Sequence, residues 1–294
     1  MHQSNNLEAL LEEDTELASL PEIFIRVSEL LDDDNSSSAQ IGMVVESDPS
    51  LSSRILKMVN SAFFGFPKTI ASISQAISIL GRDRIRQILI GVVIGGIFGD
   101  MKNKAAFMEG YWKQSVKTAI LSRLLSKESN IHEQSEILFT AGLLHQLGRL
   151  ILLQKLPEQS KEIEHGIESL GEDLYQAEQR VLGFTHCEVG AAFINKWGLP
   201  EILSEIAGHY HDPSKAQHFR DEARMVHVAN RLSFLVAEIE AEELQFALDD
   251  IPEWEHTGLD AEQILDACLV AEEQVYTVME SLGMVKMTID MDDD

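Results

Sequence analysis

The chain of 294 residues is long enough to bury one large core or two smaller ones. Lysine and arginine number 23 against 49 aspartates and glutamates, so the formal net charge is −26 at pH 7. A field of this sign repels nucleic-acid phosphates and anionic lipid head groups, which argues against both as partners. Hydrophobic residues make up 45 % and charged residues 24 %, a balance typical of a folded globular protein.

Several features of the sequence favour a reducing, cytoplasmic environment. Cys187 and Cys268 are the only cysteines and lie far apart, so neither a disulfide framework nor a zinc knuckle is indicated. The first six residues lack the basic region and apolar core of a secretion signal. The longest apolar run, residues 88–98, is too short to span a bilayer. We therefore expect a cytoplasmic protein.

The N-terminal part of the sequence predicts a series of short helices. Residues 7–18 are expected to form a short acidic helix and 22–31 a second helix, and a third starts near Ser38. Asp48 followed by Pro49 predicts a further helix start, because aspartate accepts bonds from free helix amides and proline suits the first helical position.

Two more helices are expected before residue 100. Ser72 with Gln75 three residues later forms a capping box, and this helix is expected to end at Gly81 in the left-handed conformation. Asp83 is expected to cap the next helix, residues 84–98. That helix contains glycines at 91, 95 and 96, which predict the close approach of a neighbouring backbone.

A break in composition at residues 100–109 predicts a boundary between two helical lobes. Residues 137–156 are so densely apolar that we expect them near the centre of a helical body. The remaining helices are expected at residues 111–126, 158–170, 172–182, from Thr185 to Trp197, from Pro200 to His209, 221–240 and 261–282, with a frayed acidic end at 289–294. No strand-like alternation persists, so the fold class is predicted to be all-α.

A histidine and a glutamine, His145 and Gln146, lie side by side in the apolar central stretch. A buried imidazole beside a buried amide must find hydrogen-bond partners or cost a few kcal/mol. With His186, His211 and Asn230 they form a set expected on or beside buried helices, and helical bundles build metal sites from such inward side chains. The alternative is that each histidine is a satisfied core or helix-end residue.

A set of short motifs occurs together over roughly residues 20–240. The motifs are Asp48-Pro49, Arg54-Ile55-Leu56, Asn60-Ser61-Ala62, Ile70, Ser72-Ile73, Ala76-Ile77, Leu80-Gly81, Ala141–Arg149, Glu178, Leu182-Gly183, His186, Val189-Gly190, Trp197 and Leu199-Pro200. In these motifs and in the order of its elements the chain resembles HDOD proteins, the non-catalytic branch of the HD-domain phosphohydrolase superfamily. The resemblance is specific because so many motifs occur together.

The resemblance implies a division of the chain. Residues 1–19 would be an acidic lead and 20–215 the HDOD domain, with an N-terminal lobe over 20–100 and an HD-like lobe from 106. Residues 216–294 would add C-terminal helices that complete the HD-like lobe, followed by an acidic tail. The expected fold is therefore two packed helical lobes, the second an HD-like bundle.

The resemblance also implies a depleted metal site. In catalytic HD proteins a histidine, a His-Asp pair, further histidines and a late aspartate hold one or two divalent metals. Carried over by position, these fall on Gln114, His145, Gln146, His186, Tyr210, His211 and Asn230. Gln146 and Asn230 put neutral amides where the pattern has aspartates. Because metal-assisted hydrolysis needs ligands that hold a dication, we expect no catalytic residue, no metal and no cofactor.

The function implied is a non-enzymatic bacterial signalling module that acts as an output or scaffold through protein contacts. HDOD domains often accompany receiver, kinase or cyclic-di-GMP turnover domains, so partners of these types are expected. Two alternatives stay open. One is a metal-dependent phosphohydrolase using His145, His186 and His211, since three histidines can bind catalytic zinc. The other is a nucleotide sensor that keeps the old pocket without hydrolysis.

Two further clusters each allow two interpretations. The first is a basic cluster of Arg82, Arg84 and Arg86, which could bind phosphate or form solvated ion pairs. The second is an aromatic loop with Phe63, Phe64 and Phe66, which could bind a partner or close the core. We favour the ion pairs and the core.

Overall fold

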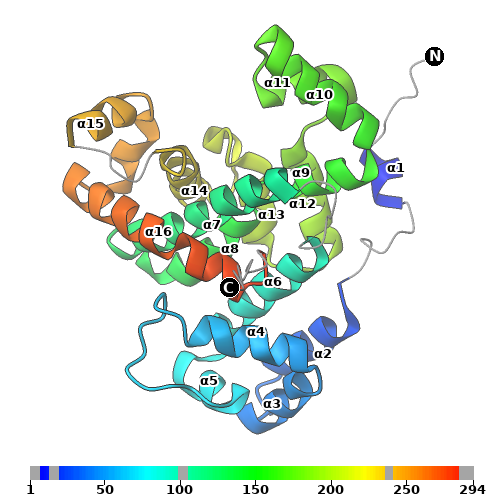
Figure 1. Cartoon of the computed structure of the whole chain (residues 1–294), viewed down its shortest axis with the longest axis vertical. Helices are drawn as coiled ribbons and strands as arrows, with labels where there is room; N and C mark the ends of the chain where they lie inside the picture. The colour runs from blue at the N-terminus through cyan, green and yellow to red at the C-terminus, as the bar shows by residue number, and fades with distance from the viewer. Residues whose placement is uncertain (1–6, 13–19, 99–104, 236–240, 285–294) are drawn as a thin grey trace, which may run out of the picture.

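The computed structural model of the protein describes residues 7–12, 20–98, 105–235 and 241–284. Over these ranges the chain forms α-helices joined by turns and short 3-10 segments, with no strand, which confirms the all-α prediction. Figure 1 shows two packed lobes, with helices α2 to α5 below and the larger bundle around α7 and α8 above. After the short α1 (Leu7–Glu12), the rest of the helix expected at 7–18 lies outside the described residues.

The helices of the N-terminal lobe are α2 (Glu22–Asp32), α3 (Ser38–Glu46), α4 (Pro49–Val59), α5 (Ile73–Leu80) and α6 (Arg82–Phe98). Two of them, α4 and α5, begin at the predicted caps Asp48 and Ser72. Ser37 and Gln40 form a capping box at the start of α3. Asp48 accepts hydrogen bonds from two backbone amides of α4, with Pro49 in the first turn as expected.

Three details around α5 and α6 differ from the prediction. The Ser72 side chain caps α5, but the Gln75 side chain accepts from the amide of Ala71 rather than completing the box. Gly81 has φ 84° and ψ 166°, a positive-φ conformation that is essentially open only to glycine and differs from the left-handed helical one. Helix α6 begins at Arg82, so Asp83 lies within its first turn and does not cap it.

The second lobe contains the predicted helices with three changes. Its helices are α7 (Ala105–Lys127), α8 (Ser135–Leu144), α9 (Leu147–Lys155), α10 (Pro157–Leu170), α11 (Leu174–Leu182), α12 (His186–Lys196), α13 (Glu201–His209), α14 (Arg220–Leu232), α15 (Ala241–Asp249) and α16 (Ala261–Ser281). The central stretch is two helices, broken at His145-Gln146. Helix α14 ends at Leu232 and not at 240, and α15 was not expected. Residues 99–104, inside the predicted lobe boundary, and the acidic end at 289–294 lie outside the described residues.

Helix α16 packs against both lobes, on α7 of the second and α4 of the first. At its C-terminal end the carbonyl oxygen of Leu282 lies 2.7 Å from the position that a Cβ on Gly95 would take, so α6 needs glycine there. The predicted approach of a neighbouring backbone is thereby confirmed at Gly95, whereas Gly91 and Gly96 face side chains instead. The buried apolar residues form one continuous cluster from Leu10 to Met284, which joins the lobes in a single core.

The aromatic loop closes the core between the lobes, as favoured. The ring of Phe63 lies 5.1 Å from that of Phe139 on α8, and the guanidinium of Arg123 lies 4.4 Å from the centroid of Phe63. Arg123 also pairs with Glu136 at 3.1 Å, and both side chains are largely buried. A cation held over an aromatic face and paired with a carboxylate links α7, α8 and the loop after α4.

The arginines of the basic cluster at the start of α6 bind carbonyl and carboxylate groups of the protein itself. Arg82 donates to the backbone carbonyls of Leu31, Asp33 and Ser36. The other two pair with carboxylates, Arg86 with Asp32 at 2.6 Å and Arg84 with Glu136 at 3.4 Å. These contacts favour the ion-pair interpretation over a phosphate site.

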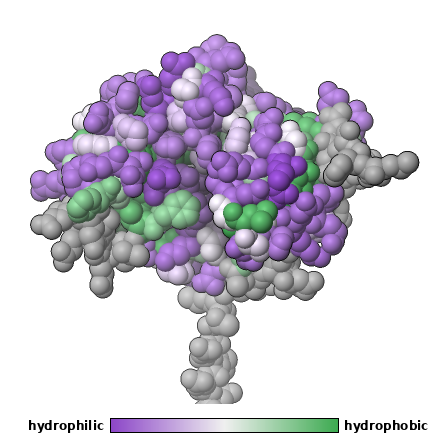
Figure 2. Space-filling view, turned by 90° about the horizontal axis from the view of Figure 1, so that it is seen from above, coloured by the Kyte–Doolittle hydropathy of each residue, from purple (hydrophilic) through white to green (hydrophobic). Residues whose placement is uncertain are grey.

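By length and composition, residues 132–155 could cross a membrane. However, 83 % of the most apolar 18-residue window in this range is buried inside the protein. The stretch is therefore accounted for as the core of the second lobe. The face drawn in Figure 2 is mostly hydrophilic, with hydrophobic side chains confined to small separate patches.

Candidate functional site

The break between α8 and α9 places His145 inside the second lobe. The ring is fully buried, and its Nδ1 donates to the carbonyl of Gly142 at 2.6 Å. Its Nε2 lies 3.1 Å from the side-chain amide of Asn230 on α14. Burial lowers the pKa of His145 to about 4, so the imidazole is neutral at pH 7.

Two amides complete this part of the site. The side chain of Gln114 on α7 lies 3.0 Å from that of Asn230, so α7, α8 and α14 meet in one hydrogen-bonded group. An amide can present either a donor or an acceptor to a neutral imidazole, whereas a carboxylate presents only an acceptor. With its proton on Nδ1, His145 accepts at Nε2, so the atom of Asn230 that faces it must be the NH2 group, with the amide turned from the orientation that places Oδ1 there; an aspartate has no such donor.

Tyr210, just after α13, lies between the two buried histidines. Its ring meets that of His145 edge to face, with centroids 4.6 Å apart. Its hydroxyl lies 2.7 Å from Nε2 of His186. Burial raises the pKa of Tyr210 to about 12, so the phenol stays protonated and carries no charge.

His186, the first residue of α12, is paired with a carboxylate from α11. Its Nδ1 lies 2.7 Å from Oε2 of Glu178, and its backbone amide donates to the same oxygen at 2.9 Å. Each side chain is 2 % exposed. Burial on its own lowers the pKa of His186, but the carboxylate of Glu178, 2.7 Å from Nδ1, holds the pKa well above the usual value. The buried contact is an imidazolium–carboxylate pair.

The other two predicted positions lie outside this network. The Gln146 side chain donates to Ser115 at 3.1 Å and accepts from Arg149 at 2.9 Å. The His211 ring stacks on Tyr175 of α11, with centroids 5.1 Å apart. Burial, followed by the charges of His186 and His227, lowers the pKa of His211. The structure thus brings five of the seven positions together and turns two away from them.

The sequence analysis missed two residues of α11 that hold this region. Glu178 was quoted only as part of a motif, and Tyr175 was not considered. A tight turn at Gly183, with φ 81°, folds α11 back on α12 and places Glu178 against His186. The sequence does contain a signal for this pair. A glutamate lies eight residues before a histidine that begins a capped helix, and a glycine that can reverse the chain lies between them.

Among the described residues, the group of three metal-ligating side chains close enough to share an ion lies elsewhere, at Glu201, Glu205 and His218 on the surface. Glu205 already accepts hydrogen bonds from the backbone amides of Gln217, His218 and Phe219. It therefore fixes the turn before α14, and the group has a structural explanation.

Comparisons with known proteins agree with this architecture. A curated relative, an uncharacterized protein of Treponema pallidum (strain Nichols), is 23 % identical over 235 residues, which are 79 % of this chain and 45 % of the relative. The chain thus spans about half the length of the curated relative it matches.

Three solved structures, each under 25 % identical, share the fold. A protein of Shewanella amazonensis SB2B, named as a proposed phosphohydrolase, has a TM-score of 0.78 at 22 % identity and covers 95 % of this chain and 99 % of its own. A proposed signal transduction protein of Marinobacter aquaeolei VT8 has a TM-score of 0.68 at 23 % identity, covering 90 % and 59 %. An HDOD domain protein with unknown function from Geobacter sulfurreducens has a TM-score of 0.67 at 21 % identity, covering 94 % of each chain.

The family comparison is more specific than the shared fold. Residues 17–213 match the HDOD domain, and this range is well over half of the 294 residues. It includes six of the seven positions carried over from the metal site of HD proteins and leaves out only Asn230. The chain therefore belongs to the HDOD domain family.

Proposed function

We propose that this protein is a non-enzymatic signalling module that acts as an output or scaffold through contacts with other proteins. Partners of the receiver, kinase or cyclic-di-GMP turnover type fit this role. Membership of the HDOD family supports a signalling role, as does the shared fold with the Marinobacter protein named for signal transduction.

The observation that carries the proposal is the electrical neutrality of the group around His145. Its neighbours Gln114, Asn230 and Tyr210 carry no charge, and the imidazole itself is neutral. The carboxylate nearest to them in the network, Glu178, is engaged by His186. A site that holds a divalent metal and activates water needs anionic ligands or open imidazole nitrogens. Here the polar groups satisfy one another.

Metal content and turnover test the proposal together. Protein purified without chelator and incubated with Mn²⁺, Fe²⁺ or Zn²⁺ is expected to retain substoichiometric metal by elemental analysis and to leave bis(p-nitrophenyl) phosphate and cyclic dinucleotides intact. The variant Asn230→Asp places a negative charge beside His145 and is expected to bind metal more tightly than the wild type. Stoichiometric metal with phosphodiesterase turnover in the wild type would overturn the proposal in favour of a hydrolase.

A further inference from the structure

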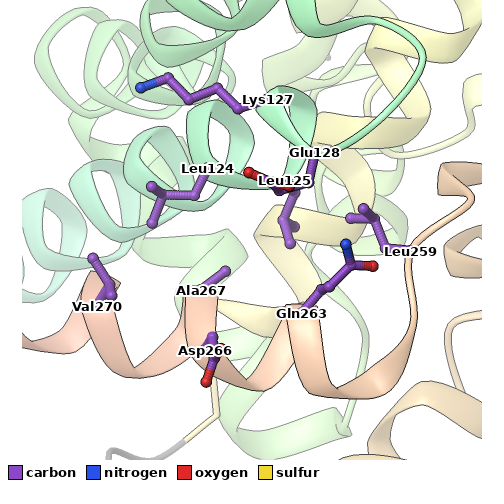
Figure 3. A pocket seen from close by; sticks show the side chains of 9 residues that line it. All are labelled: Leu124, Leu125, Lys127, Glu128, Leu259, Gln263, Asp266, Ala267 and Val270. Atoms are coloured by element: carbon purple, nitrogen blue, oxygen red, sulfur yellow. The ribbon is translucent and has the colours of Figure 1, made fainter.

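A cavity of about 310 Å³ lies between the C-terminal end of α7 and the first half of α16. Figure 3 shows side chains of both helices pointing into the space between them, Leu124 from α7 and Ala267 and Val270 from α16. Leu125 and Leu259 complete its apolar lining. The volume is at the lower end of the roughly 300–1,000 Å³ of ligand sites. The cavity can therefore take more than one apolar side chain.

The shape of the site follows from the two helices that form it. On α16 the lining residues recur at one-turn spacing, at positions 263, 266, 267 and 270, so the cavity runs along the helix rather than into the core. A groove between two helices accepts the apolar face of a third helix through anchors at i, i+3, i+4 and i+7. The geometry matches an amphipathic helix better than a compact small molecule.

The charges at the rim point to a basic occupant. Glu128 and Asp266 line the cavity, are exposed, and take part in no ion pair within the ranges that the structure describes. Helix α16 has no lysine or arginine, and its Glu262, Asp266 and Glu273 take part in no ion pair among the described residues, whereas Glu272 pairs with Lys113 and Lys117 and Glu280 with Lys57. The net charge of −26 adds a long-range field that attracts cationic partners.

Lys127 is the cation at this rim, and it lies on α7. Burial, and then the charge of Arg123, lowers the pKa of Lys127. Of the two acids at the rim, Glu128 directly follows Lys127 at the end of α7 and Asp266 lies on α16, so each wall of the groove carries one carboxylate. Basic residues of a docked helix can therefore pair on both of its sides.

We propose that this groove docks a basic amphipathic helix of a partner protein. Two apolar side chains one turn apart fill the cavity, and lysines or arginines of the partner pair with Glu128 and Asp266. The inference rests on the proposed function, because it names the surface through which the module makes its contacts.

The probe is a fluorescein-labelled helical peptide with leucines at i, i+3, i+4 and i+7 and lysines elsewhere. A scrambled peptide of the same composition has the same charge without the apolar face. Anisotropy titrations of the full chain are expected to show tighter binding of the patterned peptide. Hydrogen exchange is expected to slow on binding in residues 121–128 and 261–270.

Two variants and a matched control locate the contact. Glu128→Lys with Asp266→Lys is expected to weaken binding about tenfold. Glu29→Lys with Glu46→Lys makes the same change of net charge on exposed acids of the other lobe and is expected to leave affinity within about twofold. Ala267→Met fills the cavity with a flexible side chain and is expected to weaken binding about tenfold as well.

Equal binding of the scrambled peptide would overturn the proposal, as would equal effects of the two charge-reversal pairs. Full affinity in Ala267→Met, confirmed as folded by its circular dichroism, would also count against it. Metal content and turnover do not depend on this groove, so the docking surface can fail while the proposed function stands.

Discussion

At the scale of single residues, the site depends on the protonation state of His145. A neutral ring with its proton on Nδ1 is compatible with the buried amides around it, and an imidazolium there would lack a counter-charge. His186 is the opposite case, because Glu178 supplies the negative charge that keeps it protonated. Two buried histidines of one site therefore have pKa values displaced in opposite directions.

The variant His145→Gln tests the neutral state. The pKa of His145 is about 4 in the folded protein against 6.5 ordinarily, so between these values the unfolded chain binds a proton that the folded one does not. Titration of His145 therefore lowers the free energy of unfolding of the wild type by about 2 kcal/mol as the pH falls from 7 to 5. Urea unfolding of both proteins at each pH is expected to show their stability difference shifting by that amount.

Subtracting the free energy of unfolding of the variant from that of the wild type at each pH cancels the effect of the many carboxylates, because both proteins contain them. A stability difference that stays constant from pH 7 to pH 5 would mean that folding does not displace the pKa of His145.

At the scale of helices, local sequence predicted where elements begin. Ser37, Asp48 and Thr185 each accept hydrogen bonds from backbone amides of the helix that follows, and these signals need no knowledge of the rest of the fold. The break at His145-Gln146 had no such signal, because apolar residues continue on both sides. It arises from tertiary contacts to Asn230 and Ser115, which come from other helices.

The same distinction applies to the site. Position by position, resemblance placed Gln114, His145 and Asn230 together, and the structure has them in contact. The resemblance could not predict that Tyr175 would stack on the ring of His211, or that Glu178 would pair with the ring of His186. Those pairs depend on how α11 folds back over the site, which short motifs do not encode.

Glycine at the crossing of α6 and α16 provides a test at this scale. Gly95→Ala places a methyl group 2.7 Å from the carbonyl oxygen of Leu282 and is expected to destabilise the protein by about 1–3 kcal/mol. Gly110→Ala on α7 meets nothing within 4 Å and is expected to be neutral or to stabilise by up to about 1 kcal/mol. Thermal and urea unfolding compare the two. Similar effects of both changes would contradict the close crossing.

At the scale of the whole molecule, two features join the lobes. One is α16, which lies on α7 and α4. The other is Arg123, held between the ring of Phe63 and the carboxylate of Glu136. Because both features belong to one continuous core, we expect the lobes to unfold together rather than as separate units.

Arg123→Met tests the second connection. It removes a buried cation from Glu136 and from the aromatic face, and is expected to destabilise the protein by about 3 kcal/mol in urea unfolding. Arg180→Met removes an arginine that pairs with Glu172 and Glu162 on the surface, where solvent screens the charges, and is expected to destabilise the protein much less than Arg123→Met. Comparable losses in the two variants would show that Arg123 does not link the lobes.

The position of α16 also has a consequence for biosynthesis. The apolar faces of α4, α6 and α7 that this helix covers leave the ribosome more than a hundred residues before it does. Because nascent chains fold from the N-terminal end, these apolar faces stay exposed to solvent during translation until α16 has been made. The emerging polypeptide is therefore expected to be a client of chaperones that shield hydrophobic surface until α16 has been synthesised.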